Sequence, residues 1–268
     1  MERKPVVAGT FYPSDAKILH NIIQTLTLKQ ISTREKVLAA ISPHAGYIYS
    51  GGVAAETLGL IDLPNDIIIL GPNHHGYGAE MAVMTAGTWQ MPLGAVPINQ
   101  ELAEDIIARS AIFSSDVIAH TQEHSIEVQI PFLQFFNPGI RIVPICLSFI
   151  SLEKCQKAAE SLAAAITSWP HPVTIIASSD MTHYEPREVA KLKDRLALDC
   201  IKKLDAKALY ETVTKENISM CGFIPATIAI LTANLLGAQH AKLIRYTDSG
   251  ETSGDTSQVV GYAGMLIS

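Results

Sequence analysis

Two strongly apolar runs, each ending in a turn that carries histidine, constrain the fold of this chain more than any other feature. The first covers residues 37–41 and leads to His44, and the second covers 67–70 and leads to His74 and His75. Such runs, bounded by Pro and Gly, suit strands buried on both faces of a parallel sheet. Because ligands of open α/β sheets bind beyond the carboxyl ends of strands, we expect His44 and His74 to converge on one site. A metal ion or a reacting substrate is the first occupant to test.

Composition narrows the class of protein. The chain has 268 residues, 48% of them hydrophobic, without a break in composition, so we expect one domain over residues 1–268, with two small domains as the alternative. The net charge of −6 comes without a basic run, which argues against nucleic acid as a partner. No segment approaches the roughly 20 apolar residues that cross a bilayer, and the N-terminus lacks a signal-peptide core. We expect a cytoplasmic protein that binds no membrane.

Hydrophobic spacing and turn residues predict alternating strands and helices. Strands are expected within 6–13 (followed by a turn), 37–41, 67–70, 81–86, 141–147, 173–177, 242–246 and 259–267. Helices are expected to begin at Ser14, Gly51, Asn99 and Ser151 and to extend to about 26, 60, 108 and 168. A further helical stretch covers 187–236, interrupted near 217–220, with its last helix beginning around 221–225. This order predicts an α/β fold with a mixed, largely parallel central sheet flanked by helices.

Ionisable side chains gather at the predicted strand ends and helix starts. They are His44, His74 with His75, Glu123 with His124, Asp180 with His183, and Cys221. Taken alone, each histidine is best explained as a loop imidazole that hydrogen-bonds to backbone or water. Taken together, imidazole, carboxylate and thiol groups on one edge of a sheet indicate an active-site cleft.

The four cysteines differ in what their positions predict. Without close pairing they form neither a disulfide framework nor a C-x-x-C metal site, so we expect reduced thiols. Cys146 falls in a predicted strand, and Cys155 and Cys200 fall on predicted helices, which indicates packing or surface positions. Only Cys221, beside a glycine at a helix start, has a position where a thiolate would be stabilised.

Six motifs in order along the chain resemble the Memo family, whose prokaryotic members are also called AmmeMemoRadiSam system protein B. They are Val7-Ala8-Gly9-Thr10-Phe11-Tyr12-Pro13, Pro43-His44-Ala45-Gly46-Tyr47, Gly71-Pro72-Asn73-His74-His75, Glu123-His124-Ser125-Ile126-Glu127, Ser178-Ser179-Asp180-Met181-Thr182-His183 and Cys221-Gly222. The resemblance covers essentially the whole chain. It implies a single α/β domain related to the class III extradiol dioxygenases, which cleave catechol-type rings with non-haem iron(II).

The resemblance also implies a metal site and a pocket around it. The implied ligands are His44, His74 and Cys221, and Asp180 and His183 line the same pocket. The extradiol enzymes bind iron with two histidines and a carboxylate, whereas the third ligand here is a thiolate, which suits Fe(II), Cu(I) or Zn(II). We expect one transition metal, with Fe(II) first and Cu or Zn as alternatives.

The substrate pocket is expected to include Phe11, Tyr47 and His75. Eukaryotic Memo proteins have been regarded as binding phosphorylated peptides beside an aromatic residue at the position of Phe11. Phenylalanine lacks the indole N–H that a tryptophan would offer, so we do not extend that partner to this chain.

Two functions are compatible with these residues. The first is a metal-dependent, oxygenase-like enzyme that acts on a small aromatic substrate, with His183 or His124 as general acid or base. Asp180 would then orient an imidazole by accepting its ring N–H; alternatively, Asp180 caps a following helix. The second is a non-catalytic module that holds an anionic ligand or a protein partner in the same pocket. Protein partners from the AmmeMemoRadiSam system are expected in either case.

Overall fold

Four parallel strands form the centre of the molecule. The computed structural model describes residues 1–27 and 33–268, and within these ranges the main sheet has nine strands. Its central strands lie side by side in the following order: β2 (Ala39–Ser42), β9 (Val173–Ser178), β3 (Asp66–Pro72) and β8 (Arg141–Leu147). The carboxyl ends of β2 and β9 are in register, with Ser42 opposite Ser178. The turns after β2, β9 and β3 therefore meet at one edge of the sheet.

Antiparallel strands extend this sheet on both sides, which confirms the predicted mixed α/β class. On one side β12 (Val259–Ile267) pairs with β2, and both β10 (His183–Glu185) and β11 (Ala241–Asp248) pair with β12. On the other side β4 (Met81–Val83) pairs with β8, followed by β7 (Ser114–Ser115). A separate small sheet contains β1 (Glu2–Arg3), β5 (Thr88–Met91) and β6 (Gly94–Pro97).

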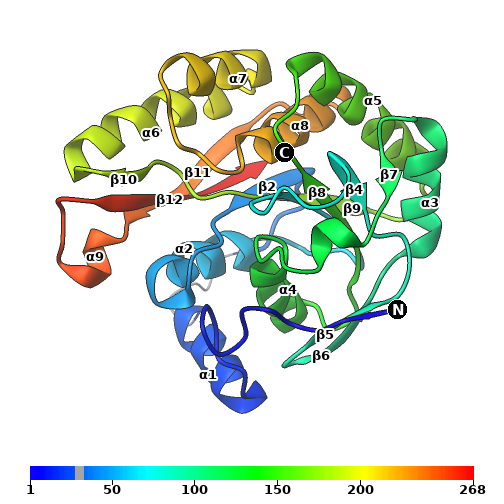
Figure 1. Cartoon of the computed structure of the whole chain (residues 1–268), viewed down its shortest axis with the longest axis horizontal. Helices are drawn as coiled ribbons and strands as arrows, with labels where there is room; N and C mark the ends of the chain where they lie inside the picture. Colours follow the sequence, from blue (N-terminus) through cyan, green and yellow to red (C-terminus); the bar gives the residue numbers. More distant parts are fainter. Residues whose placement is uncertain (28–32) are drawn as a thin grey trace.

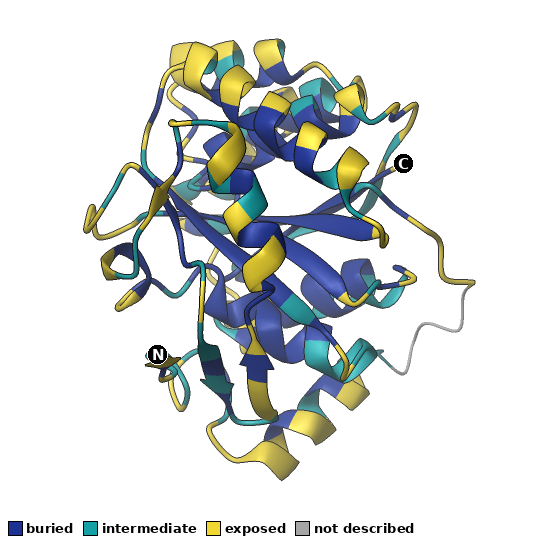
Figure 2. Cartoon of the chain, turned by 90° about the vertical axis from the view of Figure 1, so that its right-hand side faces the viewer, coloured by how far each residue is buried: buried dark blue, intermediate teal, exposed yellow. Residues whose placement is uncertain are grey.

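Helices cover both faces of the main sheet (Figures 1 and 2). One face carries α3 (Gln100–Arg109), α5 (Leu152–Ser168), α6 (Arg187–Lys202), α7 (Ala206–Lys215) and α8 (Phe223–Leu235). The other carries α1 (Ala16–Thr27), α2 (Tyr47–Gly59) and α4 (Ile130–Phe136). Successive side chains of β3 point to opposite faces of the sheet, and both faces are apolar, so each needs a layer of helices. Ile68 and Leu70 pack with the first set of helices, and Ile67 and Ile69 pack with the second. No helix in the described ranges is long and apolar enough to span a bilayer.

Most predicted elements are present, and the predicted Asn99 cap is confirmed; Ser151, where a helix was expected to begin, also caps its helix. Asn99 Oδ1 accepts the Leu102 N–H at 3.2 Å, and Ser151 Oγ accepts the Lys154 N–H at 3.3 Å. The polar cluster before α4 contains two short 3₁₀ turns, Ile118–His120 and Glu127–Gln129.

Several predicted boundaries were wrong. Residues 6–13 form a turn with one isolated bridge, and α1 is capped by Asp15, whose Oδ1 accepts the Ile18 N–H, rather than by Ser14. Strand β4 ends at Val83, the 187–236 stretch has an additional break at 203–205, and a short helix α9 (Gly250–Ser253) lies in the predicted loop before β12. The β5–β6 hairpin was not predicted.

The start of α2 was also wrong, for a packing reason. We expected Gly51 and Gly52 to open the helix, yet α2 begins at Tyr47 and contains both glycines. A Cβ on Gly51 would lie 3.0 Å from Leu26 Cδ1 of α1 and 3.2 Å from Tyr47 Cβ. Gly51 therefore permits the close approach of α1 to α2.

Candidate metal centre

The turns after two strands and the start of one helix bring the predicted ligands together. His44 follows β2, His74 follows β3, and Cys221 precedes α8, which packs against this sheet. One ligand atom from each of the three residues lies within 4.8 Å of the other two. The Cys221 Sγ and His44 Nε2 atoms are 3.3 Å apart, and the His44 and His74 ring centroids are 5.3 Å apart. The structure thus assembles residues from positions up to 177 apart in the chain.

His44 is fixed by two hydrogen bonds. Its Nδ1 lies 2.9 Å from Ser178 Oγ, and its backbone N–H donates to Asp180 Oδ1 at 2.8 Å. Burial, together with the nearby His124 and His74 rings, holds the pKa of His44 well below its ordinary value. The ring is therefore neutral at physiological pH, and Nε2 is the nitrogen nearest to Cys221.

His74 is held by the buried carboxylate of Glu123. Its Nδ1 contacts Oε1 at 2.9 Å, and its backbone N–H donates to Oε2 at 2.7 Å. Glu123 also accepts the backbone N–H groups of His124 and Ser125 at 3.0 and 2.9 Å. Burial opposes ionisation, but the hydrogen bond and charge of His74 and these N–H donors hold the pKa of Glu123 well below its ordinary value. An ionised Glu123 accepts the Nδ1–H of His74 and leaves Nε2 free for a ligand.

Cys221 sits where only glycine can follow it. A Cβ on Gly222 would lie 2.2 Å from Ser178 O, so the absence of a side chain lets the start of α8 approach the end of β9. The Cys221 Sγ accepts the Asp180 N–H at 3.3 Å. We expected this helix start to stabilise a thiolate, but burial and the Asp180 carboxyl raise the pKa of the Cys221 thiol. The thiol is therefore protonated before a metal binds.

The three donors have the chemistry and spacing of a metal site. Two imidazole nitrogens and one sulfur, bonded to a metal at about 2.0–2.3 Å, would lie about 3–4 Å from one another, close to the separations seen here. A three-donor set of this kind leaves a coordination position open. The residues present therefore fit a transition metal.

His124 lies beside this group. Its ring stacks on His74 at 4.7 Å and meets the edge of Phe11 at 4.9 Å. Burial lowers the pKa of His124 to about 4, so it is neutral at physiological pH. His74, Glu123 and His124 also form a group whose ligand atoms lie within 4.8 Å of each other. Because both Glu123 oxygens already accept hydrogen bonds, this second group serves to support His74.

Asp180 has a hydrogen-bond partner that differs from the predicted one, and His183 contacts a backbone carbonyl. Asp180 accepts the backbone N–H of His44 and, among the described residues, no imidazole N–H; the alternative helix cap was also wrong, because β10 follows it. Burial raises the pKa of Asp180 to about 6. The Nδ1 of His183 contacts Ser219 O at 2.9 Å, so Nδ1 carries the proton and Nε2 is free to accept one.

The three predicted pocket residues, Phe11, Tyr47 and His75, do not lie together in the structure. Phe11 lies against His124, whereas the Tyr47 hydroxyl donates to Val128 O at 2.9 Å and its ring stacks on Phe132 in the core. Phe11 and Tyr47 border a cavity of about 380 Å³ that none of the histidines lines. His75 is exposed and stacks on Tyr77. Of the three, only Phe11 contacts the histidine cluster.

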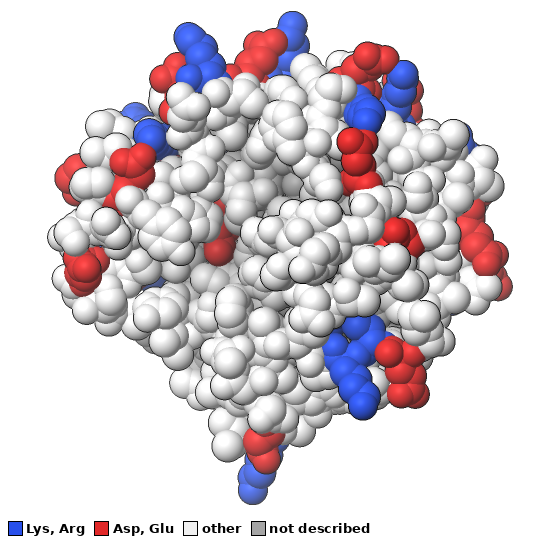
Figure 3. Space-filling view, viewed as in Figure 1, with Lys and Arg blue, Asp and Glu red and all other residues white. Residues whose placement is uncertain are grey.

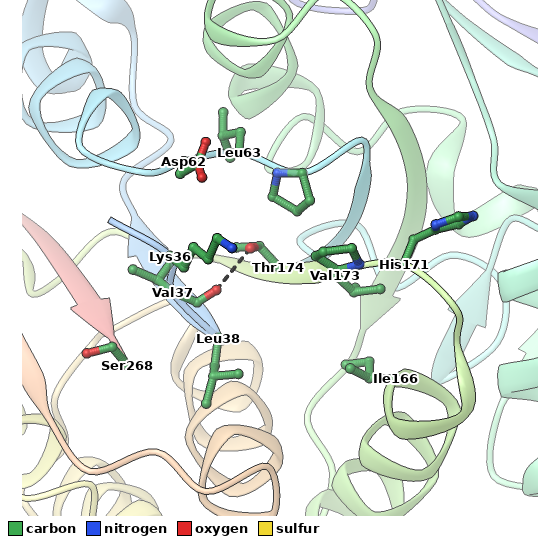
Figure 4. Close-up of a pocket in the computed structure, with 12 residues that line it drawn as sticks. Lys36, Val37, Leu38, Asp62, Leu63, Ile166, His171, Val173, Thr174 and Ser268 are labelled. Atoms are coloured by element: carbon green, nitrogen blue, oxygen red, sulfur yellow. Dashed lines mark hydrogen bonds between the residues drawn. The ribbon is translucent and has the colours of Figure 1, made fainter. Parts of the chain in front are cut away.

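A cavity of about 580 Å³ lies at the opposite edge of the sheet (Figure 4). Residues that precede β2, β3 and β9 line it, including Leu38, Leu63 and Pro172. Two of the lining residues are joined by a hydrogen bond, from Thr174 Oγ1 to Val37 O at 3.0 Å. The cavity is lined by His171 but lies at the edge of the sheet opposite to His44 and His74. Elsewhere, the face shown in Figure 3 is hollowed near its centre, where few charged side chains lie.

Sequence reasoning missed the residues that orient the ligands. Ser178 and Gln129 carried no expected role, and Glu123 was noted only for its place in the polar cluster. The one signal available was the run of carboxylate, imidazole and hydroxyl groups over residues 123–125.

Comparisons with known proteins identify similar chains and a similar fold. A family model described as Memo-like protein matches residues 3–266. A MEMO1 family protein of Pyrobaculum arsenaticum is 41% identical over 99% of this chain and 98% of its own length. One from Methanopyrus kandleri is 38% identical over 100% and 99%. The solved structure of an uncharacterized protein from Escherichia coli K12 covers 86% of this chain and 100% of that chain, with a TM-score of 0.59 and 12% identity, which shows similarity of fold.

Proposed function

The chain belongs to the Memo family, as its motifs predicted, and on that premise we propose that it is a metal-dependent, oxygenase-like enzyme acting on a small aromatic molecule. The observation that carries the proposal is the convergence of His44, His74 and Cys221 at the strand ends. Two imidazoles and a thiol within 4.8 Å make three donors rather than four, which suits a reactive metal better than a purely structural one.

One transition metal per chain is proposed, with Fe(II) first and Cu or Zn as alternatives. His44 and His74 would bind it through Nε2 and Cys221 through Sγ. When bound, the metal would supply coordination positions for substrate and oxygen.

The remaining residues of the cluster can hold or move protons. His183 has Nε2 free because Nδ1 donates to a backbone carbonyl, so it is the proposed general base. His124, neutral and beside His74, is the second candidate, and its contact with Phe11 places an aromatic surface next to the metal centre. Asp180 positions the His44 backbone, and its raised pKa of about 6 lets it exchange a proton near neutrality.

The second candidate is a non-catalytic binding module, favoured by the thiol ligand. A thiolate replaces the carboxylate that the extradiol enzymes use for iron, and a softer ligand favours metals that do not activate oxygen in this way. In that case the same pocket would hold an anionic ligand or a protein partner. Partners from the AmmeMemoRadiSam system and a cytoplasmic location are proposed on family membership.

Oxygen consumption distinguishes the two candidates. The protein is loaded anaerobically with Fe(II) and mixed with air-saturated buffer and a panel of catechols and indoles. An enzyme consumes oxygen with at least one of them, and the His183→Gln variant loses most of that rate while keeping its iron. Loaded protein that consumes no oxygen with any compound favours the binding module.

A further inference from the structure

We propose that one segment, Glu123–Gln129, determines which ring nitrogen of each histidine faces the metal centre. In this arrangement Ser178, whose hydroxyl contacts both Ser125 and Gln129, is the positioning residue for His44. This inference rests on the proposed function, because the nitrogen in question is the one that would bind metal. It is carried by a chain of buried hydrogen bonds with backbone carbonyl groups at both ends. Carbonyl oxygens only accept hydrogen bonds, so they fix every proton in the chain.

One end of this chain of hydrogen bonds, at the carbonyls of Ser42 and Pro43, sets the orientation of the Gln129 amide. Gln129 is fully buried, and its Nε2 lies 2.9 Å from Pro43 O and 3.2 Å from Ser42 O. The amide nitrogen must face these acceptors, because the flipped amide would place Oε1 against two carbonyl oxygens. Oε1 has no partner among the described residues, which shows that the donors decide the orientation. The other Nε2 hydrogen is then directed at Ser178 Oγ, 2.8 Å away.

The second end sets the hydroxyl of Ser178. This side chain has one hydrogen and two lone pairs. The hydrogen goes to Ser125 O at 2.6 Å, and one lone pair accepts from Gln129. The lone pair that is left must accept from His44 Nδ1 at 2.9 Å. His44 therefore carries its proton on Nδ1, and Nε2 faces Cys221 without a proton.

The same segment acts on the second histidine from its other end. Glu123 accepts the Nδ1–H of His74 at 2.9 Å, two residues before Ser125. The backbone N–H of Ser125 donates to the Glu123 carboxylate, and its carbonyl accepts from Ser178. Ser125 thus connects the hydrogen bonds that orient His44 with those that orient His74, and both imidazoles present Nε2 to the metal centre.

The test is the ¹⁵N NMR spectrum of the histidine rings in metal-free protein, followed by metal titration. In the wild type, His44 and His74 should both be protonated on Nδ1. Ser178→Ala removes the acceptor, so His44 should gain proton occupancy at Nε2, and metal affinity should fall about 10- to 100-fold. Ser161→Ala is the matched control: Ser161 is also buried and donates to a backbone carbonyl, that of Ile106, away from the histidines. It should leave both readouts unchanged.

Three results would overturn the proposal. The first is a wild-type His44 that is protonated on Nε2. The second is a folded Ser178→Ala protein with the wild-type spectrum and metal affinity. If Ser178→Ala fails to fold, Gln129→Met is used instead. In that variant the Ser178 hydroxyl still donates to Ser125 O, so His44 should stay protonated on Nδ1. The third overturning result is a Gln129→Met protein in which the His44 proton has moved to Nε2. The spectra need no metal, so they judge this inference even if the protein binds none.

Discussion

Cys221 is the single residue on which the chemistry of the site depends most. Its Sγ lies 3.3 Å from His44 Nε2, and burial with the Asp180 carboxyl raises the pKa of its thiol. A metal that binds Cys221 must therefore displace a proton, which makes metal affinity depend on pH.

We predict that alkylation of Cys221 by iodoacetamide is slow while metal is bound and faster after a chelator removes it. Because only the thiolate reacts, the rate in metal-free protein should rise about tenfold per pH unit below the raised pKa. Labelling is measured by mass spectrometry, with Cys146, Cys155 and Cys200 as internal references. Equal rates in both states, while metal is shown to leave, would remove Cys221 from the ligand set.

A second prediction concerns the type of metal. Cys221→Asp restores the carboxylate ligand of the extradiol enzymes and should shift preference from Cu(I) towards the harder Fe(II). Competition titrations with both metals measure the ratio of affinities. A variant that keeps the wild-type ratio would show that residue 221 does not set metal preference.

The candidate metal ligands could be predicted from sequence, but the residues that hydrogen-bond to them could not. His44 and His74 follow apolar runs that any strand pattern reveals, and the family motif added Cys221. Ser178 and Glu123 contact their histidines across 134 and 49 residues of chain, and no local pattern reports such a contact. Asp180 was misread because spacing alone does not distinguish a ring N–H from the backbone N–H of His44.

At the scale of elements, the N-terminal segment is tied to the turn before α4. Arg3 and Glu127 form a buried ion pair with 2.6 Å between Nη1 and Oε2, and Glu127 also accepts the Tyr12 hydroxyl at 2.6 Å and the Val6 N–H at 2.9 Å. These bonds hold the segment that carries Phe11 against His124.

Glu127→Ala should therefore lower the free energy of unfolding by about 3–5 kcal/mol, because it leaves the Arg3 guanidinium buried without its partner. Urea denaturation measures the change. Glu153→Ala is the control, since Glu153 pairs with Lys157 at an exposed site and its loss should leave the free energy of unfolding nearly unchanged. Equal effects from the two substitutions would refute the anchoring role.

Strands that are buried on both faces were predicted correctly. Elements whose bounds depend on packing against other elements were not. The apolar runs of β3 and β8 are compatible with few structures other than a buried strand. The β5–β6 hairpin has short strands and one half-exposed face, so its sequence gives a weak signal. Gly51 and Gly52 inside α2 have the appearance of a helix start. The position of Leu26 on α1 explains Gly51, and that of Arg245 on β11 explains Gly52.

At the scale of the whole molecule, buried histidines couple stability to pH. Burial lowers the pKa of His120 and of His124 to about 4, and that of His44 is lowered as well. As pH falls below the unfolded value of 6.5, the unfolded chain binds protons that the folded chain does not, so stability falls. Asp180, with its pKa raised from 3.8 to about 6, acts in the opposite direction over part of this range.

Metal-free protein should therefore lose stability between pH 6.5 and 4, with about 3 kcal/mol contributed by His120 alone. Urea denaturation at several pH values gives the slope, and His120→Gln should flatten it by that amount. Stability that stays constant or rises as pH falls over this range would contradict these assignments.

The central claim is that His44, His74 and Cys221 hold one transition metal, and metal content after anaerobic reconstitution tests it most directly. Wild-type protein is compared with folded His44→Ala and His74→Ala variants, and with His171→Ala, which alters a histidine at the opposite edge of the sheet. We predict about one metal per chain for the wild type and His171→Ala, and loss of that metal from the other two. Full metal content in folded His44→Ala and His74→Ala proteins would contradict the claim.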